Sequence, residues 1–259
     1  MSKAEPKPNL AARLAASGSL VTAWSAIADI QIAATLARSG FDAVTLDIQH
    51  GQHDYASCLS GIAEIRAAGC SPLARIPVGD FALAGRLLDA GAEAVIAPMI
   101  NTADDAQALV RSTKYPPLGA RSWGPLRAMA LMGMDGPAYL SRANDFCLAI
   151  AMIETAEAID NLDAILATEG LDGVLVGPGD LSVTLSNGEA IDPSGKAAQD
   201  AMATITRKAI AAGRFSAVFC NSPKDAQDAI DAGARLLAYG VDLLLLEAGA
   251  RHLLSDLRR

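Results

Sequence analysis

The chain has 259 residues, of which 51% are hydrophobic, 19% are charged and 4% are aromatic. Its 22 glycines and 12 prolines are close to average usage, which excludes collagen-like and low-complexity chains. The formal net charge is −8, and no basic stripe is present in the sequence, so nucleic acid is not an expected partner. The length allows either one α/β barrel or two smaller domains.

The cysteine pattern and the apolar segments indicate the compartment. The four cysteines, at positions 58, 70, 147 and 220, have no CxxC spacing, which is typical of buried free thiols in a reducing cytoplasm. The N-terminal segment lacks the apolar stretch of a signal peptide. The longest apolar run, 236–246, is too short to span a bilayer. We therefore expect a cytoplasmic protein that has no membrane partner.

A short β-rich run recurs along the chain, and at four places it follows a helical segment that ends in glycine. The glycine suits the left-handed position after a helix, and the nearly continuous apolar run is typical of a strand covered on both faces. Helical segments such as 82–89, 104–113 and 223–231 lie between the runs. In chain order the runs are 20–26, 39–47, 71–77, 90–98, 147–153, 169–177, 215–220 and 232–240.

Eight alternations of strand and helix predict a single parallel (β/α)8 barrel over residues 1–259, with 1–19 as an N-terminal helix or tail. The alternative is a doubly wound open sheet, which usually has a glycine-rich phosphate turn after its first strand. Here the residues after Trp24 are SAIAD. The segment 115–130 is rich in Pro, Gly and Arg, and we expect it to be a structured active-site cover or a subunit contact.

Polar residues follow four of the predicted strands. In a barrel the active site lies at the carboxyl ends of the strands, so these side chains should converge on one mouth. The four strands are neighbours or near neighbours around the rim. The polar residues are Asp47, Gln49 and His50 after the second strand, Arg75 in the third, Glu154 after the fifth and Asp180 after the sixth.

Glu154 and Asp180 are candidate metal ligands, because a carboxylate close to the core must be paired or must bind a cation. Two oxygen ligands with open positions suit a hard divalent ion such as Mg²⁺ or Mn²⁺. Each residue also has an ordinary interpretation. Asp180 precedes a possible helical turn and could be its N-cap, and Glu154 could form a salt bridge with Arg75.

Arg75 lies within an apolar strand, so its side chain must point into the mouth or pair with an acid. It could bind a carboxylate or an enolate oxygen, or it could form a buried structural ion pair. His50 is a candidate general base near neutral pH. We expect His53 to be a loop residue and His252 to lie on the surface of the C-terminal helix.

Covalent catalysis has no support in the sequence. There is no GxSxG motif, and no cysteine lies beside a histidine at a strand end. No lysine falls within a predicted strand, which argues against a Schiff base. A barrel aldolase without such a lysine needs a metal to stabilise its enolate.

The ordered segments GFDAVTLDIQHG, ARIPVGD, LLDAGAEAVIAPMINT, KYPPLGARSWGP, AMIET, GLDGVLVGPGDLS and YGVD resemble the HpcH/HpaI aldolase family from about residue 20 to about residue 250. The resemblance implies a class II, metal-dependent pyruvate aldolase that is similar to 4-hydroxy-2-oxoheptanedioate aldolases. Such an enzyme cleaves 4-hydroxy-2-oxo acids to an aldehyde and pyruvate, or a related 2-oxo acid such as hydroxypyruvate. It uses one divalent ion per site, Mg²⁺, Mn²⁺ or Co²⁺.

The resemblance also implies roles for individual residues. His50 matches the family's base, and Arg75 matches the arginine that binds the keto oxygen and stabilises the enolate. Glu154 and Asp180 match the two metal ligands. Asp89 matches an acid that reaches the histidine of a neighbouring subunit and raises its basicity.

The substrate contacts match the family less completely. The backbone N–H groups of Gly179 and Asp180 match the donors that hold the pyruvate carboxylate. Met152 stands where some members have a glutamine that contacts substrate, and Gln49 stands where some have glutamate. These departures bear on the choice of aldehyde and 2-oxo acid more than on the reaction type.

The C-terminal stretch 241–259 is very apolar for a terminal helix. Ordinary docking onto the barrel would explain this composition. The resemblance implies instead that the helix is exchanged between subunits of a hexamer, a trimer of dimers with shared active sites. Two other functions remain open: a CoA-ester lyase of the citrate-lyase β-subunit type, which would need a basic surface for the CoA phosphates, and a non-catalytic barrel that binds 2-oxo acids.

Overall fold

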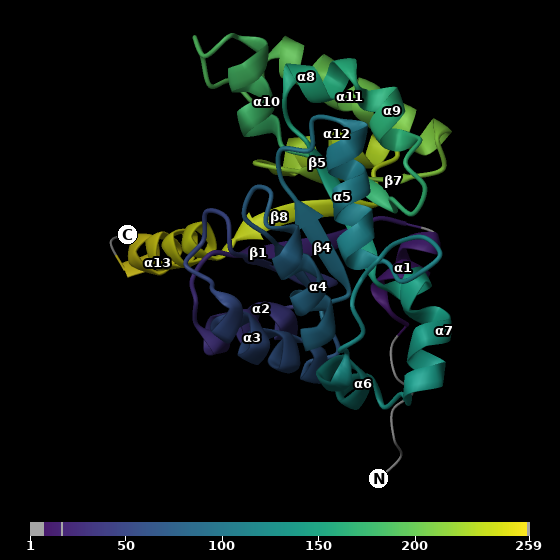
Figure 1. Cartoon of the computed structure of the whole chain (residues 1–259). Coiled ribbons are helices and arrows are strands. Elements are labelled where there is room, and N and C mark those ends of the chain that lie inside the picture. Colours follow the sequence, from purple (N-terminus) through teal and green to yellow (C-terminus); the bar gives the residue numbers. More distant parts are fainter. Residues whose placement is uncertain (1–7, 17, 258–259) are drawn as a thin grey trace.

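Parallel strands form a closed barrel in which each strand pairs with its neighbours in the sequence (Figure 1). The structure is a computed structural model that describes residues 8–16 and 18–257. The predicted (β/α)8 barrel is confirmed and the open sheet is excluded, because β1 and β8 pair directly. Each predicted run coincides with one strand, and only β8 continues one residue beyond its run. The strands are β1 (Leu20–Ser25), β2 (Ala43–Asp47), β3 (Ser71–Arg75), β4 (Ala94–Ala97), β5 (Leu148–Ile153), β6 (Gly173–Val176), β7 (Phe215–Phe219) and β8 (Leu236–Val241).

Helices surround the barrel and include the three segments predicted as helical, which are α4, α5 and α12. The glycine that ends each repeat adopts the left-handed conformation, as at Gly91 (φ 109°) and Gly233 (φ 95°). The helices are α1 (Leu10–Ala15), α2 (Ile30–Arg38), α3 (Tyr55–Ala67), α4 (Phe81–Ala90), α5 (Ala103–Thr113), α6 (Leu126–Met132), α7 (Gly136–Phe146), α8 (Ala156–Asp160), α9 (Leu162–Leu166), α10 (Pro178–Leu185), α11 (Lys196–Ala211), α12 (Pro223–Asp231) and α13 (Asp242–Leu257).

The core has an inner part within the barrel and an outer part between the strands and the helices. Helix α1 belongs to the inner part through Leu10 and Leu14, and its N–H at Leu10 donates to Glu93 Oε2 over 2.6 Å. The predicted N-terminal helix is therefore present, and residues 1–7 lie outside the described residues. All four cysteines are buried free thiols, as predicted. The cytoplasmic location stays a prediction.

The segment between α5 and β5 lies on the side of the barrel where the strands begin (Figure 1). It follows the carboxyl end of α5, and a helix that leaves the mouth runs back to the opposite side. Residues 115–130 therefore do not cover the mouth of their own barrel. The segment is anchored by Lys114, whose buried Nζ lies 2.7 Å from Asp172 Oδ2. Its contact with another subunit remains a prediction.

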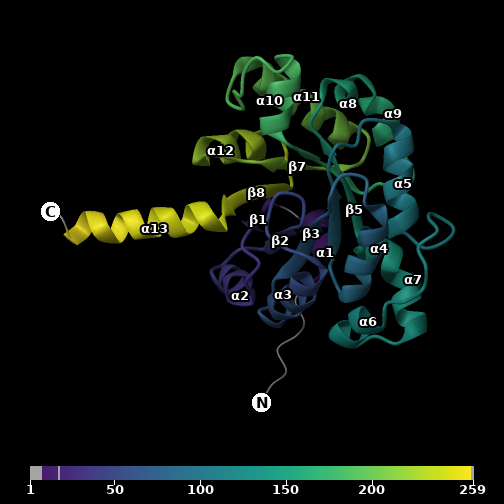
Figure 2. The same ribbon diagram turned by 60° about the vertical axis from the view of Figure 1, so that its left-hand side comes forward.

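Helix α13 extends away from the barrel (Figure 2). It does not pack along its own barrel, so the ordinary docking interpretation is wrong for this chain alone. Within residues 8–16 and 18–257, no helix is long and apolar enough to cross a membrane. The exposed leucines of α13 are Leu243, Leu244, Leu245, Leu246, Leu253, Leu254 and Leu257.

Candidate active site

A buried ion pair joins the carboxyl ends of β2 and β3, where Asp47 and Arg75 are direct register partners. Arg75 Nε lies 2.9 Å from Asp47 Oδ1, and Nη2 lies 2.6 Å from Oδ2. Trp24 Nε1 donates to Asp47 Oδ2 over 3.2 Å, and its ring lies 4.9 Å below the guanidinium carbon. Arg75 therefore pairs with an acid, but the acid is Asp47. The alternative salt bridge between Arg75 and Glu154 is not formed.

The pair keeps Asp47 ionised. Burial on its own would raise the pKa of this carboxyl, but the hydrogen bonds and charge of Arg75 outweigh burial, and the pKa is lowered. Because the fork of Arg75 uses Nε and Nη2 for Asp47, its direction is fixed.

Glu154 follows β5 and is buried, with 1% of its surface exposed. The N–H of Met99 donates to its Oε1 over 2.7 Å. Met99 has a φ of 55°, a left-handed conformation that costs a non-glycine residue about 1–3 kcal/mol. Burial, and then the charge of nearby Asp180, raise the pKa of Glu154 to about 7. The protein itself thus stabilises the ionised form of this carboxylate poorly.

Asp180 is the third residue of α10, and Gly177 occupies the N-cap position. The alternative in which Asp180 is the N-cap is therefore wrong. Asp180 is exposed, and it is close enough to Glu154 to raise its pKa. Two carboxylates, one of them buried, form a donor set that fits a hard divalent cation. Across the residues that the structure describes, no group of three or more His, Cys, Asp or Glu side chains is placed to hold a metal.

Gly177 makes room for the Glu154 carboxylate. A Cβ at this position would lie 2.6 Å from Glu154 Oε2 and 3.2 Å from the terminal methyl of Met152. Met152 is buried and supplies an apolar contact beside the carboxylate. A Cβ at Gly179 would meet nothing within 4 Å, so the backbone there faces open space. The N–H groups of Gly179 and Asp180 belong to the first turn of α10, where backbone donors have no partner within the helix.

His50 lies at the bend after β2 and is exposed at the mouth. Its backbone N–H donates to Asp47 Oδ1 over 3.4 Å, which ties the bend to the ion pair. In the described part of the chain, the buried Oε1 of Gln49 has no hydrogen-bond partner. His53 is a loop residue as predicted, but it is buried against Ser25, with Nε2 3.0 Å from the Ser25 Oγ.

Asp89 lies apart from these residues. It is in the last turn of α4, about 12 Å along the helix from its start beside the mouth. Its Oδ1 lies 2.6 Å from Arg121 Nη2. The structure therefore does not bring Asp89 to the His50 of the same chain. His252 lies on the exposed α13, as predicted.

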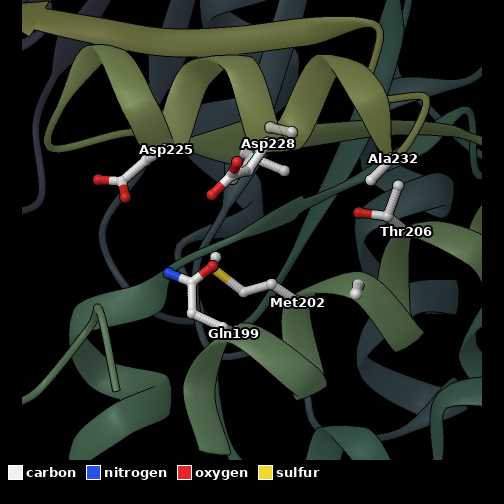
Figure 3. Close-up of a pocket in the computed structure, with 9 residues that line it drawn as sticks. Gln199, Met202, Thr206, Asp225, Asp228 and Ala232 are labelled. Carbon is white, nitrogen blue, oxygen red and sulfur yellow. The ribbon is translucent and has the colours of Figure 1, made fainter. Parts of the chain in front are cut away.

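Two hollows lie on the outside of the barrel. One, of about 380 Å³, is lined by Asp89, Arg121 and residues of α4 and α5. The other, of about 70 Å³, lies between α11 and α12, whose side chains face each other across it (Figure 3). Its acids already have partners, since Asp228 pairs with Lys224 and Asp225 accepts the N–H of Asn221. Both acids of the second hollow are therefore already engaged by their own neighbours.

Four residues contribute to this geometry in ways that the predicted roles do not include. Asp47 is predicted at the mouth without a partner, although counting along the two neighbouring strands pairs it with Arg75. The roles of Met99, Gly177 and Arg121 depend on contacts between distant segments. No local pattern in the sequence indicates them.

The chain is similar to known proteins over most of its length. A hydroxypyruvate/pyruvate aldolase of Rhizorhabdus wittichii is 36% identical over 91% of this chain and 92% of its own length. A 4-hydroxy-2-oxovalerate aldolase of Novosphingobium aromaticivorans is 34% identical over 88% of this chain and 86% of its own. The crystal structure of a family protein from Burkholderia cenocepacia is similar with a TM-score of 0.87 and 31% identity, and the match covers 96% of this chain and 99% of that one.

The family model described as HpcH/HpaI aldolase/citrate lyase matches residues 20–248, which span the barrel from β1 into α13. The match includes the ends of β2, β3, β5 and β6, where the polar residues of the mouth lie. The relative of Rhizorhabdus wittichii, which exceeds 30% sequence identity, matches 91% of the chain. The chain belongs to the HpcH/HpaI aldolase/citrate lyase family.

Proposed function

We propose that this protein is a metal-dependent aldolase that reversibly cleaves 4-hydroxy-2-oxo acids to an aldehyde and pyruvate, or a related 2-oxo acid such as hydroxypyruvate. One observation carries the proposal. The buried Glu154 lies within electrostatic reach of both Asp180 and Arg75 at one mouth. Two carboxylates beside a fixed guanidinium suit a small anionic substrate that is bound through a cation.

Glu154 and Asp180 would hold the divalent ion, Mg²⁺, Mn²⁺ or Co²⁺. The ion supplies Lewis-acid stabilisation to the oxygens of the 2-oxo acid when it is bound. The raised pKa of Glu154 supports this assignment, because a cation would restore its ionised form. The space left by Gly177 beside Oε2 supports it as well.

The other residues at the mouth bind the substrate and move its proton. The N–H groups of Gly179 and Asp180 bind the carboxylate, and Met152 forms an apolar wall. His50 accepts the proton of the 4-hydroxyl as the C3–C4 bond breaks. The electron pair of that bond passes to the 2-oxo group, which leaves an aldehyde and an enolate. Arg75 stabilises the enolate oxygen by about 3–4 kcal/mol, and protonation at C3 gives the 2-oxo acid.

The assembly completes the site in this proposal. Asp89 assists the His50 of a neighbouring subunit, and α13 is exchanged between subunits of a hexamer built as a trimer of dimers. Two observations support these assignments. Asp89 lies on the outer surface of its own barrel, beside a hollow of about 380 Å³. Helix α13 exposes a row of leucines that its own barrel does not cover.

The test is pyruvate release from 4-hydroxy-2-oxo acids before and after treatment with EDTA. We expect activity to disappear on chelation and to return with Mg²⁺, Mn²⁺ or Co²⁺. Activity that survives thorough chelation would overturn the metal mechanism. Activity retained in His50→Ala or Arg75→Ala would overturn those two roles.

The same assay separates the alternative functions. Cleavage of a CoA ester in place of the free acid would indicate a lyase of the citrate-lyase β-subunit type. Binding of pyruvate without turnover of any substrate would indicate a non-catalytic barrel. A panel of aldehydes offered with pyruvate and with hydroxypyruvate then identifies the preferred substrates.

A further inference from the structure

Asp89 shares an ion pair with Arg121 whose two members differ in exposure. The side chain of Arg121 is 1% exposed, and that of Asp89 is 26% exposed. Arg121 Nη2 lies 2.6 Å from Asp89 Oδ1. The pair thus presents its acidic member to the surface and keeps its basic member in the interior.

The guanidinium of Arg121 is held from several sides. Its central carbon lies over the ring of Tyr115, 4.7 Å from the ring centroid. Nη1 contacts Cys147 Sγ over 3.4 Å, and Nη2 lies 3.4 Å from the hydroxyl of Tyr139. A guanidinium that is held by these contacts and shielded from water also orients the carboxylate that it binds.

The second carboxylate oxygen of Asp89, Oδ2, lies beside Gly124. Oδ2 lies 3.3 Å from the position that a Cβ at Gly124 would occupy, so the glycine leaves space beside it. Asp89 and Arg121 both line the hollow of about 380 Å³ on the outside of the barrel. With Oδ1 occupied by Arg121, Oδ2 is the acceptor that remains for a group arriving from outside.

We infer that Arg121 is a positioning residue that holds the Asp89 carboxylate through Oδ1 and aims its Oδ2 at the His50 of a neighbouring subunit. This inference rests on the shared active site proposed above. It also defines what Asp89 does there. Held by Arg121 through one oxygen, Asp89 orients the imidazole ring of that histidine through the other.

A purely structural role for Arg121 makes a different prediction in mixed oligomers. If Arg121 acts through Asp89, its loss damages the site of the neighbour and leaves its own His50 intact. An oligomer that contains Arg121→Met and His50→Ala subunits then includes sites with an intact histidine from one subunit and an intact Asp89–Arg121 pair from the other. A structural defect in the barrel of the variant subunit would not be repaired in this way.

We expect Arg121→Met alone to lower kcat by about 10- to 100-fold, as loss of an orienting partner does, with KM for the 2-oxo acid nearly unchanged. Mixing with His50→Ala should restore part of the lost kcat. Arg66→Met is the matched control, because Arg66 forms a comparable pair with Glu93 at 3.1 Å and has no place in the proposed site. It should keep kcat. If Arg121→Met does not fold, Arg121→Lys keeps the charge, loses the fork and is mixed in the same way.

Native mass spectrometry verifies that the subunits have mixed, and Asp89→Asn with His50→Ala tests the shared site itself. Rescue of Asp89→Asn without rescue of the Arg121 variant overturns the inference and leaves the shared site standing. If neither Asp89→Asn nor the Arg121 variant is rescued in verified mixed oligomers, both the inference and the shared site are overturned. A double variant gives a second readout. Arg121→Met should cost no further kcat when Asp89→Asn is already present, and an additional loss would show that Arg121 acts by another route.

Discussion

The ion pair between Asp47 and Arg75 should contribute to stability as well as to the site. Asp47→Ala removes the only carboxylate that the Arg75 fork contacts in the described residues, at 2.9 and 2.6 Å. The guanidinium that remains is 8% exposed and cannot regain its water shell. Removing one partner of a buried pair in this way costs about 3–5 kcal/mol. We expect the free energy of unfolding to fall by this amount.

Denaturant unfolding followed by circular dichroism measures the change, and Tm should fall by at least about 6 °C for a chain of this size. The matched control is Asp163→Ala. Asp163 pairs with Lys208 at 2.8 Å, but the two side chains are 80% and 42% exposed. Loss of such a surface pair costs at most about 1 kcal/mol. A loss in Asp47→Ala no larger than that of the control would refute the reasoning.

Two further measurements separate the charge from the packing. The double variant Asp47→Leu/Arg75→Met replaces the pair by apolar side chains and should recover most of the stability, though not the activity. The pH dependence has a definite sign, because the folded-state pKa of Asp47 is lowered. Its stabilisation is complete above the unfolded pKa of about 3.9 and is lost as pH falls through the lower folded value. The stability gap between the native protein and Asp47→Asn should therefore narrow only below about pH 4.

Three other predictions concern the metal site and the assembly. Gly177→Ala places a Cβ 2.6 Å from Glu154 Oε2 and should weaken Mn²⁺ binding at least about tenfold by calorimetry, whereas Gly179→Ala should not. Since the pKa of Glu154 is raised to about 7, protons compete with the metal below that pH, and Mn²⁺ affinity should fall about tenfold per pH unit there. Leu253→Glu on α13 should lower the oligomer mass measured by light scattering, while Ile191→Glu, equally apolar and 79% exposed, should not.

Each of these predictions has a clear contrary outcome. Equal Mn²⁺ affinity in Gly177→Ala and in Gly179→Ala would show that the carboxylate does not need the space beside Gly177. An affinity that stays constant from about pH 5 to about pH 8 would show that Glu154 does not titrate at the metal site. An unchanged mass for Leu253→Glu would mean that the leucines of α13 do not form the contact between subunits.

The barrel could be predicted because its signals are local. A helix that ends in a left-handed glycine and leads into a buried strand needs only a few consecutive residues, and the repetition of this unit defines the topology. The placement of polar residues after strands followed from the same pattern. The position of 115–130 was also open to prediction, since a segment that follows a barrel helix must lie on the side where strands begin.

Contacts between distant segments could not be predicted in the same way. Glu154 had Arg75 as its expected ordinary partner, yet its Oε1 accepts the backbone N–H of Met99. Every residue except proline has a backbone N–H, so the sequence does not indicate which one will donate to a given side chain. The left-handed φ of Met99 is also unexpected, because methionine rarely adopts it. Likewise, Arg121 follows a Pro-Gly segment that suggests a loop, and only the fold buries it against Asp89.

The charges at the mouth favour the cation that the proposed function places there. Arg75 is the only arginine at the mouth that the described residues assign to an ion pair, and Asp47 already balances its charge. The positive charge of Arg75 still acts to lower the pKa of Glu154. Burial and the negative charge of Asp180 outweigh it, so the pKa is raised. Asp89 brings no uncompensated charge either, because Arg121 accompanies it. The negative charge of Glu154 and Asp180 is thus left unbalanced by the protein, and in the proposed function a divalent ion that neutralises them would also provide the positive site for an anionic 2-oxo acid.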